Sequence, residues 1–129
     1  MPKGFQEKDL KQYHGFVYLI TCIKTKKKYI GRKYLWKKVK KKGKKVTVES
    51  DWRTYKSSCD PLKADILQYG VEAFTFEILS FYKSKGQVNY SEIKEQFSRD
   101  VLYSKLPSGE FEYYNTCILN RYWRRLDND

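Results

Sequence analysis

Two short apolar runs near the start of the chain are separated by a lysine-containing turn. Residues 16–21 (FVYLIT) and 27–34 (KKYIGRKY) are rich in Val, Ile, Tyr and Phe, which predicts the two strands of a β-hairpin. A third strand is predicted at 73–82 (AFTFEILSFY), where every second residue from Phe74 to Ile78 is apolar. The pattern therefore indicates a small sheet in which alternate residues share a face.

Start and stop signals predict a helix between the second and third strands. Ser58 or Asp60 is a candidate N-cap, Pro61 suits the first helical position, and Gly70 suits the C-cap. The apolar stripe of this helix is expected to contain Leu62, Ile66 and Leu67.

A longer helix is predicted over residues 87–106. Ile93, Phe97 and Val101 recur at spacing four and should form its apolar side, whereas Glu92 and Gln96 share a different side. The segment PSG at 107–109 ends the pattern, and an extended aromatic segment, EFEYYNTCILNRYW, follows before a short charged tail.

The chain is strongly basic, with a formal net charge of +12 over 129 residues. Residues 37–45 (KKVKKKGKK) hold seven lysines. This segment and the residues after it predict a second hairpin that turns near Gly43, with Val39, Val46 and Val48 as its sparse apolar side. Such a charge excess favours polyanionic partners, because neutralising phosphates releases their counterions. A merely solvated lysine surface is the alternative.

Several classes of protein are disfavoured by the sequence. The apolar runs are far shorter than the roughly 20 residues of a membrane span, and the N-terminus lacks the apolar core of a signal peptide, so we expect a cytoplasmic protein without membrane contact. Cys22, Cys59 and Cys117 are widely spaced, with His14 as the one histidine. Neither a disulfide framework nor a zinc site is indicated.

Several motifs together resemble the GIY-YIG endonuclease family. GFVY (15–18) is similar to its first motif and YIG (29–31) matches its second. The order that follows also fits: DWRTYKSS, a strand, a glutamate-bearing helix with YSEIKEQF, and YYN. These last segments resemble the phage-encoded, single-domain, homing-endonuclease-like branch, and the resemblance covers roughly residues 15–120.

This resemblance implies a metal-dependent phosphodiesterase with Tyr18, Tyr29 and Lys33 in its site. Strand alternation places Tyr29, Gly31 and Lys33 on one face, and Tyr18 lies on the neighbouring strand. Gly31 is expected to leave room for a phosphate to approach the backbone. A phenol near pKa 10 is a poor base unless a metal or cation lowers its pKa, so Lys33 or an arginine is needed beside it.

The remaining site residues are implied by the family pattern. Arg53 is the preferred phosphate-binding arginine; Arg32 is nearer in sequence, but alternation sends it to the face opposite Tyr29. Glu92 is the preferred ligand for Mg²⁺ or Mn²⁺, with Glu95 as the alternative one helical turn away. Asn115 is expected either to hold the phosphate or reacting groups or to form a turn.

We therefore expect one α/β (α+β) domain over residues 1–129, with a three-stranded, mainly antiparallel sheet flanked by helices and a basic insertion at 34–50. The expected activity is magnesium-dependent cleavage of DNA, expected to be double-stranded. A catalytically silent nucleic-acid-binding domain of the same fold is the alternative. DNA contacts are expected from the seven lysines of the insertion: Lys37, Lys38, Lys40, Lys41, Lys42, Lys44 and Lys45.

Overall fold

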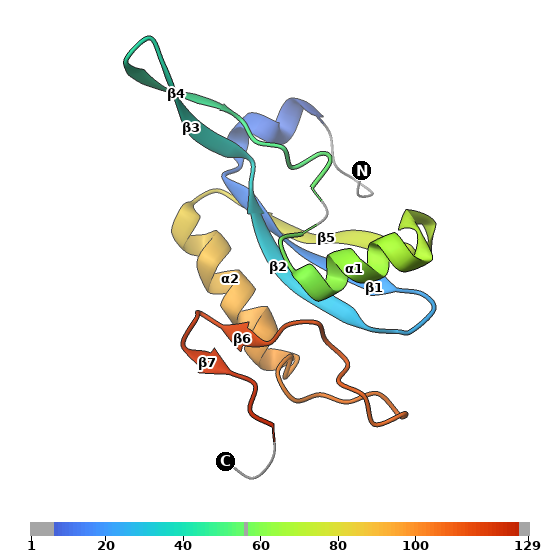
Figure 1. The fold of residues 1–129 in the computed structure, drawn as a ribbon. Coiled ribbons are helices and arrows are strands. Elements are labelled where there is room, and N and C mark those ends of the chain that lie inside the picture. Colours follow the sequence, from blue (N-terminus) through green and yellow to red (C-terminus); the bar gives the residue numbers. More distant parts are fainter. Residues whose placement is uncertain (1–6, 56, 127–129) are drawn as a thin grey trace.

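A three-stranded antiparallel sheet forms the centre of the molecule (Figure 1). The structure is a computed structural model, and it describes residues 7–55 and 57–126. Strands β1 (Gly15–Cys22), β2 (Lys28–Tyr34) and β5 (Phe74–Tyr82) lie in the order β2-β1-β5. This arrangement confirms the predicted fold class and leaves β2 as an edge strand.

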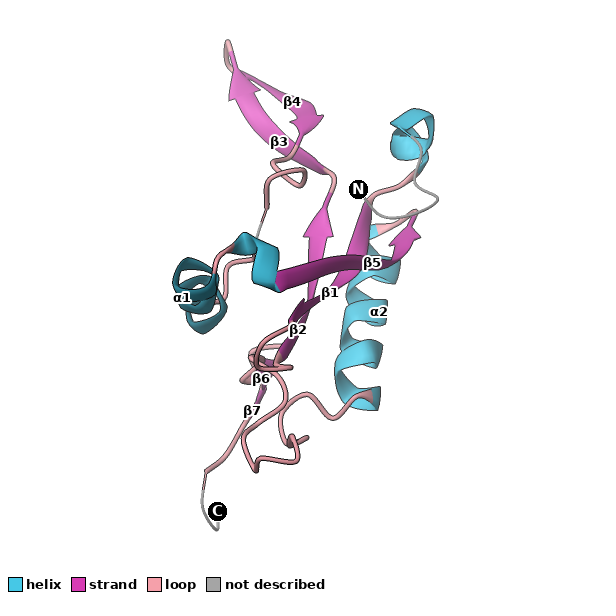
Figure 2. Ribbon diagram, turned by 90° about the vertical axis from the view of Figure 1, so that its right-hand side faces the viewer, coloured by secondary structure: helices cyan, strands magenta, loops and turns pink. Residues whose placement is uncertain are grey.

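The two helices lie on opposite faces of this sheet (Figure 2). Helix α1 (Asp60–Tyr69) covers the face that carries Phe16, Tyr18 and Ile20, whereas α2 (Lys85–Ser98) covers the face of Val17 and Ile30. Short 3-10 helices, η1 (Glu7–Gln12) and η2 (Val71–Ala73), precede β1 and β5. None of the helices within the described ranges is long and apolar enough to cross a membrane.

The position of α1 was predicted closely, but two details were wrong. Cys59 occupies the N-cap position and makes no side-chain capping bond, so neither Ser58 nor Asp60 is the cap. Leu62 is fully buried, whereas Leu67 is 88% exposed and does not belong to the apolar stripe. The helix is therefore held by a narrow contact around Leu62 and the partly buried Ile66.

Helix α2 ends at Ser98, eight residues before the predicted end. Asp100 has φ of 51°, and the N–H groups of Asp100 and Val101 bond back to the carbonyls of Phe97 and Gln96. This pattern is a Schellman motif, which terminates a helix. Val101 is buried just beyond the helix, and the inward residues of α2 are Val88, Glu92 and Gln96, so the predicted stripe through Phe97 was wrong.

The lysine-rich segment forms the predicted second hairpin and projects away from the body of the protein (Figures 1 and 2). Strands β3 (Trp36–Lys41) and β4 (Lys44–Glu49) pair antiparallel as a separate ribbon. The turn contains Lys42 and Gly43 with φ of 50° and 76°, which is the backbone sign required by a two-residue type I′ turn. Ser50 N–H donates to Leu35 and closes the base of the ribbon.

The aromatic C-terminal segment is a loop that docks on the edge of β2. Tyr113 forms a parallel bridge with Lys28, and two short strands follow, β6 (Cys117–Ile118) and β7 (Tyr122–Trp123). The guanidinium of Arg124 bonds to the carbonyls of Val101, Leu102 and Tyr113 and thereby fixes the end of the described chain.

Candidate active site

A cleft of about 840 Å³ lies between the edge of β2, the start of α1, helix α2 and the C-terminal loop. Five of the six residues predicted for catalysis line it: Tyr18, Tyr29, Lys33, Glu92 and Asn115. They come from four separate segments of the chain, so the fold brings together residues that are up to 97 positions apart in sequence. Arg53 is the one predicted catalytic residue that does not line the cleft.

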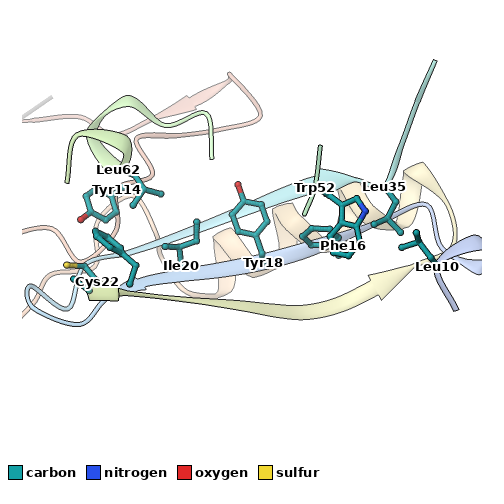
Figure 3. Close-up of a cluster of buried hydrophobic side chains, with 11 residues drawn as sticks. Leu10, Phe16, Tyr18, Ile20, Cys22, Leu35, Trp52, Leu62 and Tyr114 are labelled. Atoms are coloured by element: carbon teal, nitrogen blue, oxygen red, sulfur yellow. The ribbon is translucent and has the colours of Figure 1, made fainter. Parts of the chain in front are cut away.

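The two tyrosines pack against each other above Gly31. Their ring centroids are 6.2 Å apart, and Figure 3 shows the Tyr18 hydroxyl at the end of a ring that rises from the core. A Cβ atom at Gly31 would lie 2.5 Å from the Tyr18 hydroxyl oxygen and 2.8 Å from the Tyr29 ring. The space above Gly31 is therefore filled by the phenols, and the expected approach of a phosphate to this backbone was wrong.

Burial makes both phenols harder to ionise than an ordinary tyrosine. Burial is the main cause that raises the pKa of Tyr18 far above its usual value, and the negative charge that Tyr29 carries when it is ionised is the second. Burial likewise raises the pKa of Tyr29. A hydrogen bond from the Ser57 side chain opposes the pKa rise in each case. While protonated, the two phenols are hydrogen-bond donors or positioning groups rather than ready bases.

Lys33 reaches the cleft beside a third tyrosine that the sequence analysis did not single out. Its Nζ lies 2.6 Å from an Asp51 carboxylate oxygen and 4.0 Å from the centre of the Tyr55 ring. The Tyr55 ring in turn meets Tyr18 edge to face, with centroids 6.2 Å apart. Tyr55 lies in the segment DWRTYKSS, whose resemblance to phage-encoded proteins was the one feature of the sequence that could have identified this tyrosine.

Of the two candidate arginines, the structure places Arg32 in the cleft and Arg53 outside it. The Arg53 Nε donates to Glu49 at 2.7 Å, and its guanidinium lies 4.6 Å from the centre of the Trp52 ring. Arg32 lines the cleft and pairs with Glu92, with Nη1 and Oε1 2.5 Å apart. Arg53 was preferred because strand alternation directs Arg32 to the face opposite Tyr29. However, β2 is an edge strand and the cleft extends around its edge, so Arg32 reaches the cleft from that opposite face.

Of the two candidate glutamates, Glu92 lines the cleft and Glu95 does not. Glu92 is 9% exposed, and burial raises its pKa despite the opposing influence of Arg32. Glu95 does not line the cleft and instead pairs with Arg99 at 2.8 Å along the same helix. The geometry thus favours the predicted choice of Glu92, whose role stays a prediction.

Asn115 is buried and uses its amide to hold strand β2. Its Oδ1 accepts from the Ile30 N–H at 3.0 Å, and its Nδ2 donates to the Ile30 carbonyl at 2.8 Å. Gln96 also donates to this carbonyl, at 3.2 Å. Both side chains therefore position the strand that carries Tyr29 and Arg32. Gln96 was noted in the sequence only as a neighbour of Glu92.

The lysines predicted to bind DNA are exposed along the β3–β4 ribbon. Lys37, at the base, also lines the cleft, whereas the other six lie on the projecting part. The register sets Lys40 opposite Lys45 and Lys41 opposite Lys44. Directly opposed like charges destabilise an isolated ribbon, so these pairs favour the binding of anions.

Comparison with known proteins gives one family. A family model described as "Putative endonuclease segE, GIY-YIG domain" matches residues 1–118. No curated protein and no solved structure matches the chain.

Proposed function

The chain belongs to the GIY-YIG endonuclease family, and from this premise we propose that it is a magnesium-dependent endonuclease that cuts double-stranded DNA. The proposal rests on the convergence of two phenols, an ammonium group, a guanidinium and a carboxylate in one cleft. Membership of this family indicates a nuclease with a nucleic-acid substrate; the metal, the duplex and the assignments below are proposed.

Glu92 is the residue that would hold the metal. Among residues 7–55 and 57–126, no group of three or more His, Cys, Asp or Glu side chains is placed to hold an ion. A single carboxylate fits Mg²⁺, or Mn²⁺ in its place, because Mg²⁺ keeps several waters and completes its shell with substrate phosphate oxygens. When bound, the ion supplies charge stabilisation at a phosphate oxygen and lowers the pKa of a bound water.

The other cleft residues would bind and orient the scissile phosphate. Arg32 presents a planar guanidinium, which suits bidentate contact with phosphate oxygens, and Lys33 adds a second positive charge. The protonated phenols of Tyr18 and Tyr29 would donate hydrogen bonds to the attacking water or to phosphate oxygens. Asn115 would act indirectly, by holding β2 through Ile30.

The β3–β4 ribbon would supply most of the affinity for DNA. A two-stranded ribbon fits the width of the major groove, and lysines along its length can reach the phosphates that flank the groove. Because Lys37 belongs to both the ribbon and the cleft wall, a duplex bound along the ribbon leads to the proposed catalytic residues. The resemblance of DWRTYKSS and YYN to phage members supports a phage-type enzyme acting in the cytoplasm of a bacterial host.

A plasmid assay tests this function directly. Supercoiled plasmid is incubated with the protein in Mg²⁺ or in EDTA, and nicked and linear products are separated on a gel. We expect nicking in Mg²⁺ and none in EDTA. Binding without nicking in both conditions would indicate the alternative, a silent binding domain, and nicking in EDTA would contradict the proposed metal.

A further inference from the structure

A second groove, of about 360 Å³, lies between the end of α2 and the β6–β7 segment. We call it the aromatic groove, and its large lining side chains are Phe97, Tyr103, Tyr122 and Trp123. These side chains are 51%, 44%, 47% and 55% exposed, respectively. Exposed apolar residues are usually scattered singly over a protein surface. Four exposed rings that line one groove therefore indicate a binding surface.

Three of the four rings make contacts with neighbouring groups. Phe97 and Tyr122 meet edge to face with centroids 5.7 Å apart. The Tyr103 hydroxyl accepts from the Arg125 N–H at 3.0 Å, and Arg124, next to Trp123, is fixed by three backbone carbonyls. These contacts hold Phe97, Tyr103 and Tyr122 in place before a ligand binds, which reduces the entropy cost of binding.

Positive charge accompanies the rings, and the groove adjoins the proposed catalytic cleft. Arg121 and Arg125 line the groove, together with one carboxylate, Asp100. Gln96 lines both the groove and the cleft, and the cleft residues Leu119 and Asn120 run directly into the groove residues Arg121 and Tyr122. A polyanion bound in the cleft can thus continue into the aromatic groove.

We propose that the aromatic groove binds an unstacked nucleotide of the nucleic acid whose backbone lies in the cleft. Aromatic faces stack on bases of any sequence, at about 1–3 kcal/mol per base, and nearby arginines can contact the adjoining phosphates. In an intact duplex the base faces are covered by their neighbours. The groove therefore selects nucleic acid with an unpaired or gapped position, an inference that rests on the proposed function and refines its substrate class.

The test measures binding in EDTA, so that it does not depend on cleavage. The probes are a duplex with a three-nucleotide gap carrying 2-aminopurine in its single strand and an intact duplex of the same sequence. We compare wild type, Trp123→Ala and Trp123→Phe with a matched control, Tyr90→Ala. Tyr90 is a 67% exposed aromatic residue on α2 that lines neither the cleft nor the aromatic groove.

We expect wild type to quench 2-aminopurine and to bind the gapped probe more tightly than the intact one. Loss of a base stack of about 1–3 kcal/mol should make Trp123→Ala roughly 5- to 150-fold weaker on the gapped probe, with little change on the intact duplex. Trp123→Phe should keep most of the preference, and Tyr90→Ala should keep all of it.

Three results would overturn the inference. One is equal affinity of wild type for the two probes, and another is a uniform loss in Trp123→Ala on both. The third is a wild-type dimer that Trp123→Ala converts to a monomer, which would make the groove an interface between copies of the chain. Because nicking of intact plasmid is measured separately, failure of this inference is distinguishable from failure of the proposed function.

Discussion

Replacing Glu92 by Gln should stop cleavage while leaving the fold and DNA binding nearly intact. The change removes the negative charge proposed to hold the metal and keeps the size of the side chain. Helix α2 provides a matched control in Glu95, because each glutamate is paired with an arginine, Arg32 for Glu92 and Arg99 for Glu95, and only Glu92 lines the cleft. Glu95→Gln should therefore cleave normally.

The two effects of Glu92→Gln on stability oppose each other. Loss of the ion pair costs at most about 1 kcal/mol, because the Arg32 side chain is 42% exposed and solvent screens the pair. Burial raises the pKa of Glu92 because it destabilises the charged carboxylate. A neutral amide at this position does not carry that penalty. The free energy of unfolding should therefore change by about 1 kcal/mol or less.

The effect on the rate should be much larger. Charge stabilisation by a bound metal is worth several kcal/mol in a transition state, which corresponds to a loss of about 10³-fold or more. Three measurements separate the effects: plasmid nicking in Mg²⁺, duplex affinity in EDTA, and thermal unfolding. Normal nicking by Glu92→Gln, or loss of nicking in Glu95→Gln with Glu92→Gln still active, would refute the assignment of the metal ligand.

Four further predictions concern the cleft and the ribbon. Tyr18→Phe and Tyr29→Phe should each slow nicking by roughly 10²-fold; wild-type rates in both would make the two phenols core residues only. Because burial raises the pKa of Tyr18 in the folded state, wild type should lose stability as pH rises above about 10, and Tyr18→Phe should lose less in alkaline unfolding curves. Gly31→Ala should cost about 1–3 kcal/mol in chemical denaturation, since its Cβ would collide with both phenols, and an unchanged midpoint would show that the rings can move away. Replacing the ribbon lysines Lys40, Lys41, Lys42 and Lys44 with Gln should weaken binding equally on all sequences and reduce the slope of log affinity against log salt by about 0.9 per lost phosphate contact, whereas a selective loss at preferred sites would indicate base recognition.

The sheet and the start of α1 were predictable because their signals are local. The continuous apolar run of β1 is typical of a strand that is buried on both faces, and Pro61 and Gly70 mark the two ends of α1 through their own backbone preferences. The end of α2 was not predictable in this way. Asp100 takes the left-handed conformation that usually indicates glycine, and the apolar spacing continues past it to Val101, so periodicity alone extends the helix.

The error over Arg32 shows how this site depends on the edge of a sheet. Alternation correctly places Tyr29 and Arg32 on opposite faces of β2, but it says nothing about where long side chains end. In the part of the chain that the structure describes, β2 is the outermost strand on its side of the central sheet. The outer edge of β2 is instead taken by Asn115 and Gln96, which bind the Ile30 backbone, and beyond that edge Arg32 meets Glu92 from α2. One edge strand can thus deliver a phenol from one face and a guanidinium from the other into a single cleft. A central strand could not do this, because neighbours on both sides would separate the two faces.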